Sequence, residues 1–223
     1  MRRAAIRASI DAMTTTASTN DRLPIGTFDG VEFDAVAWGP AHADVDFSVA
    51  CMFEHELGAG MTGGLLALDD ALGGQLARLR AAGAFRAQAM ETLLVTTPPP
   101  GVTASAVLVI GMGDPAALDG DVLRRACRVA LREAVRFGAR SMAFAPSVLD
   151  AGHTDNAALA MQDVMLDGVL GALRAERMLA EAGLAHAPAL RHCTFDVGAP
   201  RLLAAGRAFA AAFERLTAGS DDR

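Results

Sequence analysis

Hydrophobic positions repeat with two different spacings along the chain, and the spacing separates predicted strands from predicted helices. Apolar or alternating runs of strand length lie at residues 31–38, 47–53, 91–97, 105–110, 141–145 and 190–197. Apolar residues recur every three or four positions, as in amphipathic helices, at residues 65–82, 119–137, 155–182 and 200–216. Strands that alternate with helices in this way indicate a mixed, largely parallel sheet with helices on both faces.

The pattern is typical of one domain that follows an N-terminal tail. Residues 1–19 are rich in Arg, Ser and Thr and contain a single acidic residue, Asp11, so we expect residues 1–26 to be a disordered tail. The same composition fits an organellar transit peptide, and Met13 offers a later start. No repeat or linker interrupts the remainder, so residues 27–218 are predicted to form a single domain, followed by a short tail at 219–223.

Composition excludes several kinds of chemistry. The 223 residues carry a net charge of −6, and all 20 basic residues are Arg. A Schiff-base or phosphate-loop lysine is therefore impossible. The three cysteines are widely spaced, which predicts reduced core residues in a cytoplasmic protein. No apolar run of 18 residues is present, so we expect no membrane partner.

The central part of the chain carries a resemblance to a known family. Residues 68–74 read LDDALGG, Phe85 and Glu91 follow, and a predicted strand ends in GMGDP at residues 111–115. These motifs resemble the N-terminal domain of the cytosolic leucyl aminopeptidase family, in which a helix of the form LD..LGG.L..L...G.F.GK.GE precedes two strands, the second ending in GLG.P. The similarity spans residues 31–212, and its central third is the most specific part.

The resemblance implies a fold and limits the expected activity. The family's N-terminal domain looks like the macro domain, so we expect an α/β protein with a three-layer αβα sandwich and a mixed, largely parallel sheet. The family's peptidase site lies in a separate C-terminal domain, where a lysine, aspartates and a glutamate hold two metal ions. This chain has no lysine and no NTDAEGRL signature. We therefore expect a stand-alone domain with no catalytic residue, no metal site and no cofactor.

The chain departs from the family pattern at one motif and imitates another. The family's GK.GE corresponds to the segment Arg86-Ala-Gln-Ala-Met-Glu91. Residues 194–198, TFDVG, resemble the family's metal-site strand TFDSGG but lack its second glycine and the surrounding lysines. Because this motif precedes the last predicted helix, we interpret it as the terminal strand of the domain rather than as a metal site.

The best candidate for a ligand site is the loop predicted after residues 105–110. Gly111, Met112, Gly113 and Asp114 follow an apolar strand and lead into a helix. Loops in this position bind ligands in open α/β sheets, and their N–H groups can hold an anion. The alternative is that the two glycines only make a tight turn. In macro domains a comparable sheet edge binds ADP-ribose, but no matching set of Asp and Asn residues is evident here.

Other polar groups are interpreted as surface. Glu54-His55-Glu56, His42 with Asp44 and Asp46, and His153 with Asp155 lack a recognised metal-ligand spacing. His192 and Cys193 are adjacent on a predicted strand and so face opposite sides, which disfavours a catalytic pair. The arginines of the 119–137 helix could meet acidic partners, but the net charge of −6 argues against nucleic acid.

The sequence therefore favours a non-catalytic relative of the aminopeptidase N-terminal domain with a regulatory, small-ligand or partner-binding role. One alternative is a macro-type binder or hydrolase of ADP-ribose-like nucleotides, with a small anionic ligand. Another is a scaffold for a separate aminopeptidase catalytic chain. Self-association is also expected, because members of this family form oligomers and because Leu203, Phe209 and Phe213 cannot share one face with Leu202 and Leu216.

Overall fold

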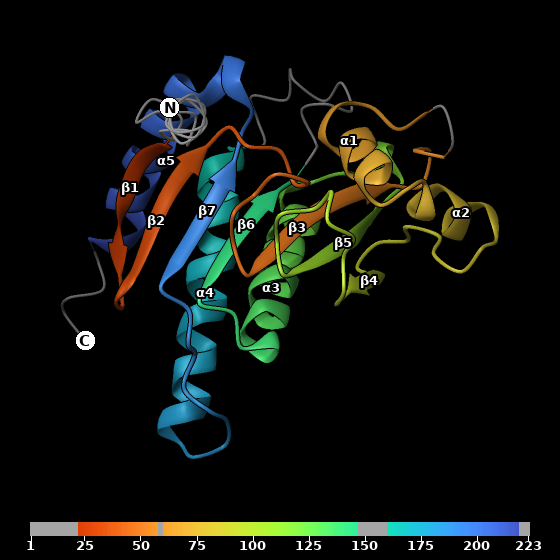
Figure 1. The fold of residues 1–223 in the computed structure, drawn as a ribbon. Coiled ribbons are helices and arrows are strands. Elements are labelled where there is room, and N and C mark those ends of the chain that lie inside the picture. Colours follow the sequence, from red (N-terminus) through yellow and green to blue (C-terminus); the bar gives the residue numbers. More distant parts are fainter. Residues whose placement is uncertain (1–21, 58–59, 147–159, 219–223) are drawn as a thin grey trace, which may run out of the picture.

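A computed structural model describes residues 22–57, 60–146 and 160–218 (Figure 1). Its described residues contain one sheet built from β1 (Arg22–Phe28), β2 (Val31–Val36), β3 (Phe47–Phe53), β4 (Thr92–Val95), β5 (Ala106–Gly113), β6 (Ser141–Ala145) and β7 (His192–Asp196). The helices are α1 (Gly63–Ala71), α2 (Gln75–Ala81), α3 (Gly120–Phe137), α4 (Met161–Glu181) and α5 (Leu202–Thr217), with short 3₁₀ turns at Pro115–Ala117 and Ala199–Arg201.

The seven strands lie in the order β1-β2-β7-β6-β3-β5-β4. The five central strands, β2, β7, β6, β3 and β5, run parallel to one another. The outermost strands, β1 and β4, pair antiparallel with β2 and β5. Because the central strands are parallel, their carboxyl ends meet at one edge of the sheet.

Side chains that alternate along the strands fill two separate cores, one on each face of the sheet. On β3, Phe47, Val49 and Cys51 belong to the core beneath α3, α4 and α5. Ala50 and Met52 on the same strand belong to the core beneath α1 and α2. The two helical layers on opposite faces can be followed in Figure 1. The predicted three-layer αβα sandwich with a mixed, mostly parallel sheet is confirmed.

The sheet begins earlier than the sequence pattern indicated. Residues 22–26 fall within the predicted tail, but they belong to edge strand β1, so this boundary was wrong. Arg22–Phe28 alternates too weakly to be recognised alone, and its place is decided by packing against α5. A Cβ added at Gly26 would lie 2.4 Å from the Phe213 ring, so only glycine allows this approach.

The helix predicted at 65–82 is two helices. Gly73 and Gly74 separate α1 from α2 with φ values of 66° and 75°, which favour glycine. The buried Asp69 carboxylate accepts the N–H groups of Leu76 at 2.8 Å and Ala77 at 3.1 Å, and so caps the second helix. The hydrophobic period continues through the break, which is why it did not reveal two helices.

The surplus apolar face predicted for residues 200–216 is not present. Phe209 is 1% and Phe213 6% exposed, because both pack against the sheet, and Leu202 is buried as well. Only Leu203 is strongly exposed among the large apolar residues of α5. This helix therefore provides no argument for self-association, which stays a prediction from the family resemblance.

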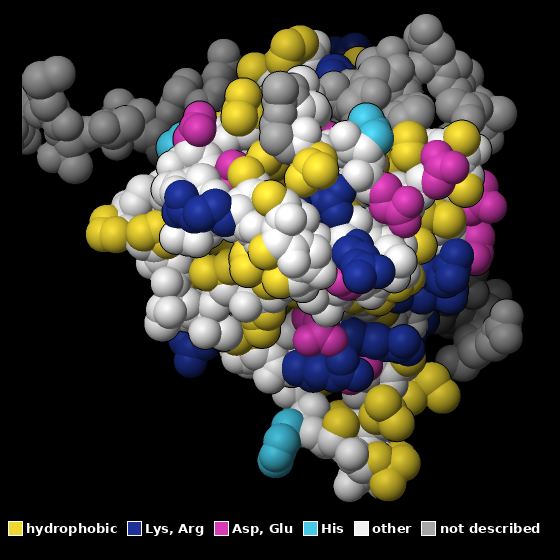
Figure 2. Space-filling model, turned by 90° about the vertical axis from the view of Figure 1, so that its right-hand side faces the viewer, with side chains coloured by type: hydrophobic (Ala, Val, Ile, Leu, Met, Phe, Trp, Pro, Cys, Tyr) yellow, Lys and Arg dark blue, Asp and Glu magenta, His cyan; other side chains and the backbone are white. Residues whose placement is uncertain are grey.

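The last two turns of α4 project beyond the sheet (Figure 1). The buried residues of this helix end at Leu173, whereas Met178 and Leu184 are 67% and 75% exposed. Figure 2 shows hydrophobic side chains at this projecting end. Among the described residues, no helix is both long and apolar enough to span a membrane.

Candidate functional site

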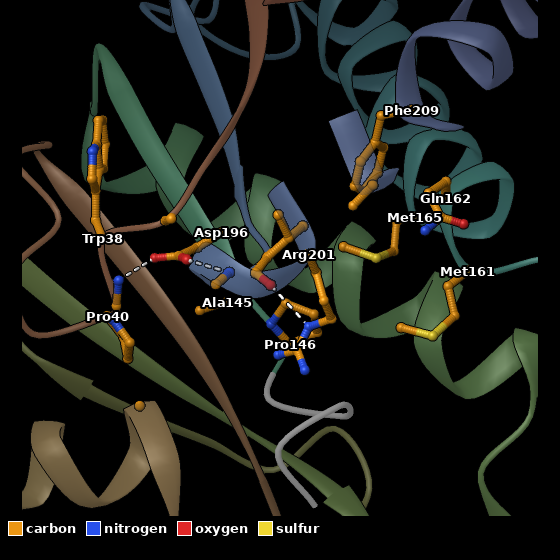
Figure 3. A pocket seen from close by; sticks show the side chains of 16 residues that line it. Trp38, Pro40, Ala145, Pro146, Met161, Gln162, Met165, Asp196, Arg201 and Phe209 are labelled. Atoms are coloured by element: carbon orange, nitrogen blue, oxygen red, sulfur yellow. Dashed lines mark hydrogen bonds between the residues drawn. The ribbon is translucent and has the colours of Figure 1, made fainter. Parts of the chain in front are cut away.

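A cavity of about 220 Å³ lies at the carboxyl edge of the parallel strands (Figure 3). Its walls come from the residues after β2, from the ends of β6 and β7 and the residues that follow them, from the first residues of α1 and α4, and from the first half of α5. Parts of the chain that are distant in sequence therefore share the cavity. A volume of this size holds a small ligand rather than one or two water molecules.

The fold explains why a cavity forms here. β3 and β6 are neighbours in the sheet, but α1, which follows β3, and α4, which follows β6, pack on opposite faces. The helices α1 and α4 therefore lie on opposite sides of the carboxyl edge of the sheet, and the cavity lies between their first residues. Such a topological switch point is where open α/β sheets bind ligands.

Asp196 joins two walls of the cavity. It is the last residue of β7, and its Oδ2 accepts the N–H of Gly39, in the segment after β2, at 2.5 Å. Its Oδ1 accepts the N–H of Gly198 at 3.3 Å. Asp196 is 8% exposed, and its carboxylate is held by these two charge-assisted hydrogen bonds.

Trp38 and a group of apolar side chains stand on opposite sides of the cavity. Figure 3 shows the indole on the side of Asp196 and Pro40, whereas Met161, Met165 and Phe209 lie across from it. Phe209 is held by stacking on Phe195 of β7, with ring centroids 4.4 Å apart and planes 11° apart. The cavity therefore combines a flat aromatic group with a flexible, sulfur-containing wall.

The electrostatic field in the cavity is set by helix ends and one arginine. The helices α1, α4 and α5 begin at its wall, and none of them is capped by the side chain of its N-cap residue. By contrast, Asp119 caps α3 away from the cavity. The guanidinium of Arg201 also lines the cavity, and its Nε donates to the Val197 carbonyl at 3.0 Å. Converging helix N-termini and a cation favour an anionic group.

The predicted ligand residues 111–114 lie elsewhere. Gly111, Met112 and Gly113 are the buried last residues of β5 rather than a loop. The N–H of Gly111 donates to Glu91 at 2.7 Å and that of Gly113 to Ala87 at 3.0 Å. Asp114 caps the following 3₁₀ turn by accepting the N–H of Ala116 at 2.9 Å. Two of the amides that were expected to hold an anion are thus engaged by the 87–91 segment.

The structure also places the other polar candidates. Glu56 is 2% exposed rather than on the surface, and it accepts the N–H of Phe53 at 2.7 Å. His192 is half-buried and faces Glu32, whereas Cys193 lies in the core. Within the described residues no group of three or more His, Cys, Asp or Glu side chains could hold a metal ion. His153 and Asp155 lie outside the described residues.

The buried cysteines are not candidates for nucleophiles. Cys51, Cys127 and Cys193 are free and fully buried. Burial raises the pKa of each of these thiols above its ordinary value, because the thiolate would be desolvated. The prediction that they pack in the core as reduced residues agrees with this geometry.

The arginine-rich face of α3 is largely neutralised by acidic side chains. Arg124 contacts Asp167 of α4 at 2.7 Å, and Arg132 contacts Glu176 of α4 at 3.4 Å. Arg125 pairs with Asp121 on its own helix at 2.9 Å. On the face drawn in Figure 2, basic and acidic side chains are interspersed.

Sequence reasoning missed most of the cavity. The TFDVG motif at residues 194–198 was correctly interpreted as the terminal strand, but its Asp196 is a wall of the site. One signal was available: Trp38 and Asp196 each lie at the carboxyl end of a predicted strand, and parallel strands end at one edge of the sheet. Gln162 and Arg201 also line the cavity. Their positions could not be inferred, because the sequence did not show against which strands their segments pack.

Comparison with known proteins identifies the family of this chain and its fold neighbours. The family model described as "Cytosol aminopeptidase family, N-terminal domain" matches residues 54–168. No curated protein matches the sequence significantly.

Solved structures with low sequence identity share the fold. A Trypanosoma brucei macrodomain in complex with ADP-ribose is 22% identical, with a TM-score of 0.58 over 86% of this chain and 74% of that one. An Oceanobacillus iheyensis macrodomain mutant is 11% identical, with a TM-score of 0.59 over 88% and 94%. A tomato leucine aminopeptidase mutant is 15% identical, with a TM-score of 0.58. The match covers 87% of this chain but only 38% of the tomato chain.

Proposed function

Because this chain belongs to the cytosol aminopeptidase family through its N-terminal domain, we propose that it is a small-ligand-binding domain. The proposed ligand is an anionic nucleotide of the ADP-ribose class, held in the cavity at the carboxyl edge of the sheet. The observation that carries this proposal is the combination, in one cavity, of Trp38, Arg201 and the N-terminal ends of three helices.

The two kinds of wall suit the two parts of such a ligand. A planar base gains stacking energy on an indole ring, which is worth about 1–3 kcal/mol in nucleic-acid complexes. Phosphates gain from the helix N-termini and from the bidentate geometry of a guanidinium such as that of Arg201. The T. brucei macrodomain, which shares the fold, was solved with ADP-ribose, and this supports the choice of ligand class.

Binding without turnover is the preferred form of the proposal. A hydrolase of such nucleotides needs a group that activates water. Asp196 is the one carboxylate among the described cavity walls, and each of its oxygens is already engaged by a backbone N–H. We therefore assign a binding and regulatory role and not a catalytic one.

Calorimetric titration of the purified protein with ADP-ribose tests the proposal. We expect saturable binding, and we expect Arg201→Gln to weaken it about tenfold or more, because a charge-assisted hydrogen bond is lost. Arg207→Gln is the matched control, since Arg207 is exposed on α5, the helix that directly follows Arg201, and lies outside the cavity wall. Absence of binding at millimolar ligand, or equal losses in both variants, would contradict the proposal.

A further inference from the structure

Trp38 is the single tryptophan of the chain, and it is held by an arginine from outside the cavity. The guanidinium carbon of Arg22 lies 5.1 Å from the centroid of the indole ring, a cation–π contact. Arg22 belongs to β1 and does not line the cavity, whereas Trp38 does. The indole thus contacts a cation of the protein and also borders the cavity.

The position of Arg22 is itself determined by a buried carboxylate. Its Nη1 lies 3.2 Å from Oδ2 of Asp34 on β2, and Asp34 is 7% exposed. The register of β1 on β2 places Arg22 opposite Val36, two residues before Trp38. The same side chain therefore links a buried acid in the sheet to the aromatic ring at the rim.

The backbone beside Trp38 is restrained independently. The N–H of Gly39 donates to Asp196, which belongs to the next strand of the sheet. In Figure 3 the indole is seen close to edge-on, and the cavity lies to one side of its plane. The hydrogen bond restrains the main chain. The Trp38 side chain packs in part against the core beneath α1 and α2, and Arg22 holds the indole through its ring.

We infer that Arg22 is a positioning residue, which holds Trp38 so that one face of the indole forms a stacking subsite for a planar aromatic ring of the ligand. The inference rests on the proposed function for the identity of the ligand, but the restraint of Trp38 exists without ligand. It assigns a role to β1, which lies outside the segment matched by the family model.

Tryptophan fluorescence tests the restraint in the ligand-free protein, because no other residue contributes indole emission. We expect Arg22→Met to increase acrylamide quenching of Trp38 about twofold or more, and Arg22→Lys to have a smaller effect because it keeps a cation. Arg174→Met is the matched control: Arg174 makes a similar contact with Phe28, at 4.7 Å, outside the cavity. Asp34→Asn should also increase quenching, since it removes the partner of Arg22.

Two probes then test the subsite. ADP-ribose contains a base, and ribose 5-phosphate does not. We expect Arg22→Met to weaken ADP-ribose binding about two- to fivefold, the range for loss of one cation–π contact, and to leave ribose 5-phosphate binding unchanged. Arg201→Gln should weaken both probes. This difference separates an effect on the stacking subsite from a general loss of structure.

The outcomes are distinguishable. If neither probe binds the unmodified protein, both the proposed function and the stacking subsite are wrong. The quenching data then decide by themselves whether Arg22 restrains Trp38. If both probes bind but Arg22→Met weakens them equally, the stacking subsite is wrong and the proposed function stands. Quenching that is the same in Arg22→Met and in the unmodified protein would overturn the positioning role.

Discussion

Asp196 accepts the N–H of Gly39 at 2.5 Å across 157 residues of sequence, and so joins the end of β2 to the end of β7. A second N–H, from Gly198, meets the other carboxylate oxygen. The shape of the cavity therefore depends on a side chain that the sequence presents only as part of a strand.

Replacement of Asp196 tests this dependence. We expect Asp196→Ala to lower the free energy of unfolding by about 2 kcal/mol, because two partly buried N–H groups lose their acceptor. Asp196→Asn should lose less, since its carbonyl oxygen still accepts one of them. Urea unfolding measures both values, and equal stability of the two variants would show that these hydrogen bonds contribute little.

At two positions this chain has another residue where the family motif has glycine, yet the backbone there adopts a conformation that favours glycine. With Phe85 and Glu91 aligned to F.GK.GE, the family's glycines correspond to Ala87 and Met90, whose φ values are 59° and 66°. An L-residue in this region is strained by about 1–2 kcal/mol.

Ala87→Gly should therefore leave stability within about 0.5 kcal/mol of the unmodified protein, because relief of strain offsets the lost methyl group and the added unfolded-state entropy. Ala104→Gly is the control: Ala104 is buried in the same core at 2% exposure and has no positive φ. There we expect a loss of about 1–2 kcal/mol. If thermal unfolding shows that Ala87→Gly and Ala104→Gly lose similar stability, the backbone at Ala87 is not strained.

Gly111 lies against the main chain of Gln88, and no side chain fits between them. A Cβ at position 111 would be 2.1 Å from the Gln88 carbonyl oxygen. We expect Gly111→Ala to destabilise the protein by about 3 kcal/mol, because backbone must shift to relieve the clash.

Gly171→Ala is the matched control, since a Cβ there meets nothing within 4 Å and the residue lies inside α4. It should stabilise the protein by about 0.5–1 kcal/mol. The folded fraction of Gly111→Ala should still bind ADP-ribose, because residue 111 is not a cavity wall. Loss of binding in a variant that remains folded would instead favour the ligand site predicted at residues 111–114.

Asp34 predicts a pH dependence of stability. Burial raises its pKa above the ordinary 3.8, Glu32 acts in the same direction, and Arg22 and His192 oppose the shift. Between pH 3.8 and the raised pKa, Asp34 is therefore more protonated in the folded state than in the unfolded state. Its contribution to the free energy of unfolding is complete below pH 3.8 and decreases as the pH rises through the folded-state pKa.

Urea unfolding from pH 3.5 upwards, compared between the unmodified protein and Asp34→Asn, measures that contribution. We expect the stability of the unmodified protein to fall relative to Asp34→Asn as pH rises through this window and then to stay level. If the ion pair with Arg22 outweighed burial, the stability of the unmodified protein would instead rise relative to Asp34→Asn with increasing pH. If the two pH profiles of stability were parallel, the pKa of Asp34 would not be shifted.

Local patterns in the sequence determined most of the elements. The predicted limits of β3 and β6, Phe47–Phe53 and Ser141–Ala145, agree with the structure residue for residue. The helix predicted at 119–137 is α3, with Asp119 as its N-cap and Gly138 as its left-handed C-cap. Such features are predictable because burial periodicity and capping depend on residues within a few positions of one another.

The cavity was decided only by the tertiary structure. Trp38, Arg201 and Asp196 meet because strand order places the ends of β2, β6 and β7 together, and because α1 and α4 leave the sheet on opposite faces. Arg22 joins them from a strand that the sequence pattern assigned to a tail. The sequence by itself determined which segments are strands and helices, whereas long-range packing of those segments decided which side chains share a site, since no local period encodes the order of strands in a sheet.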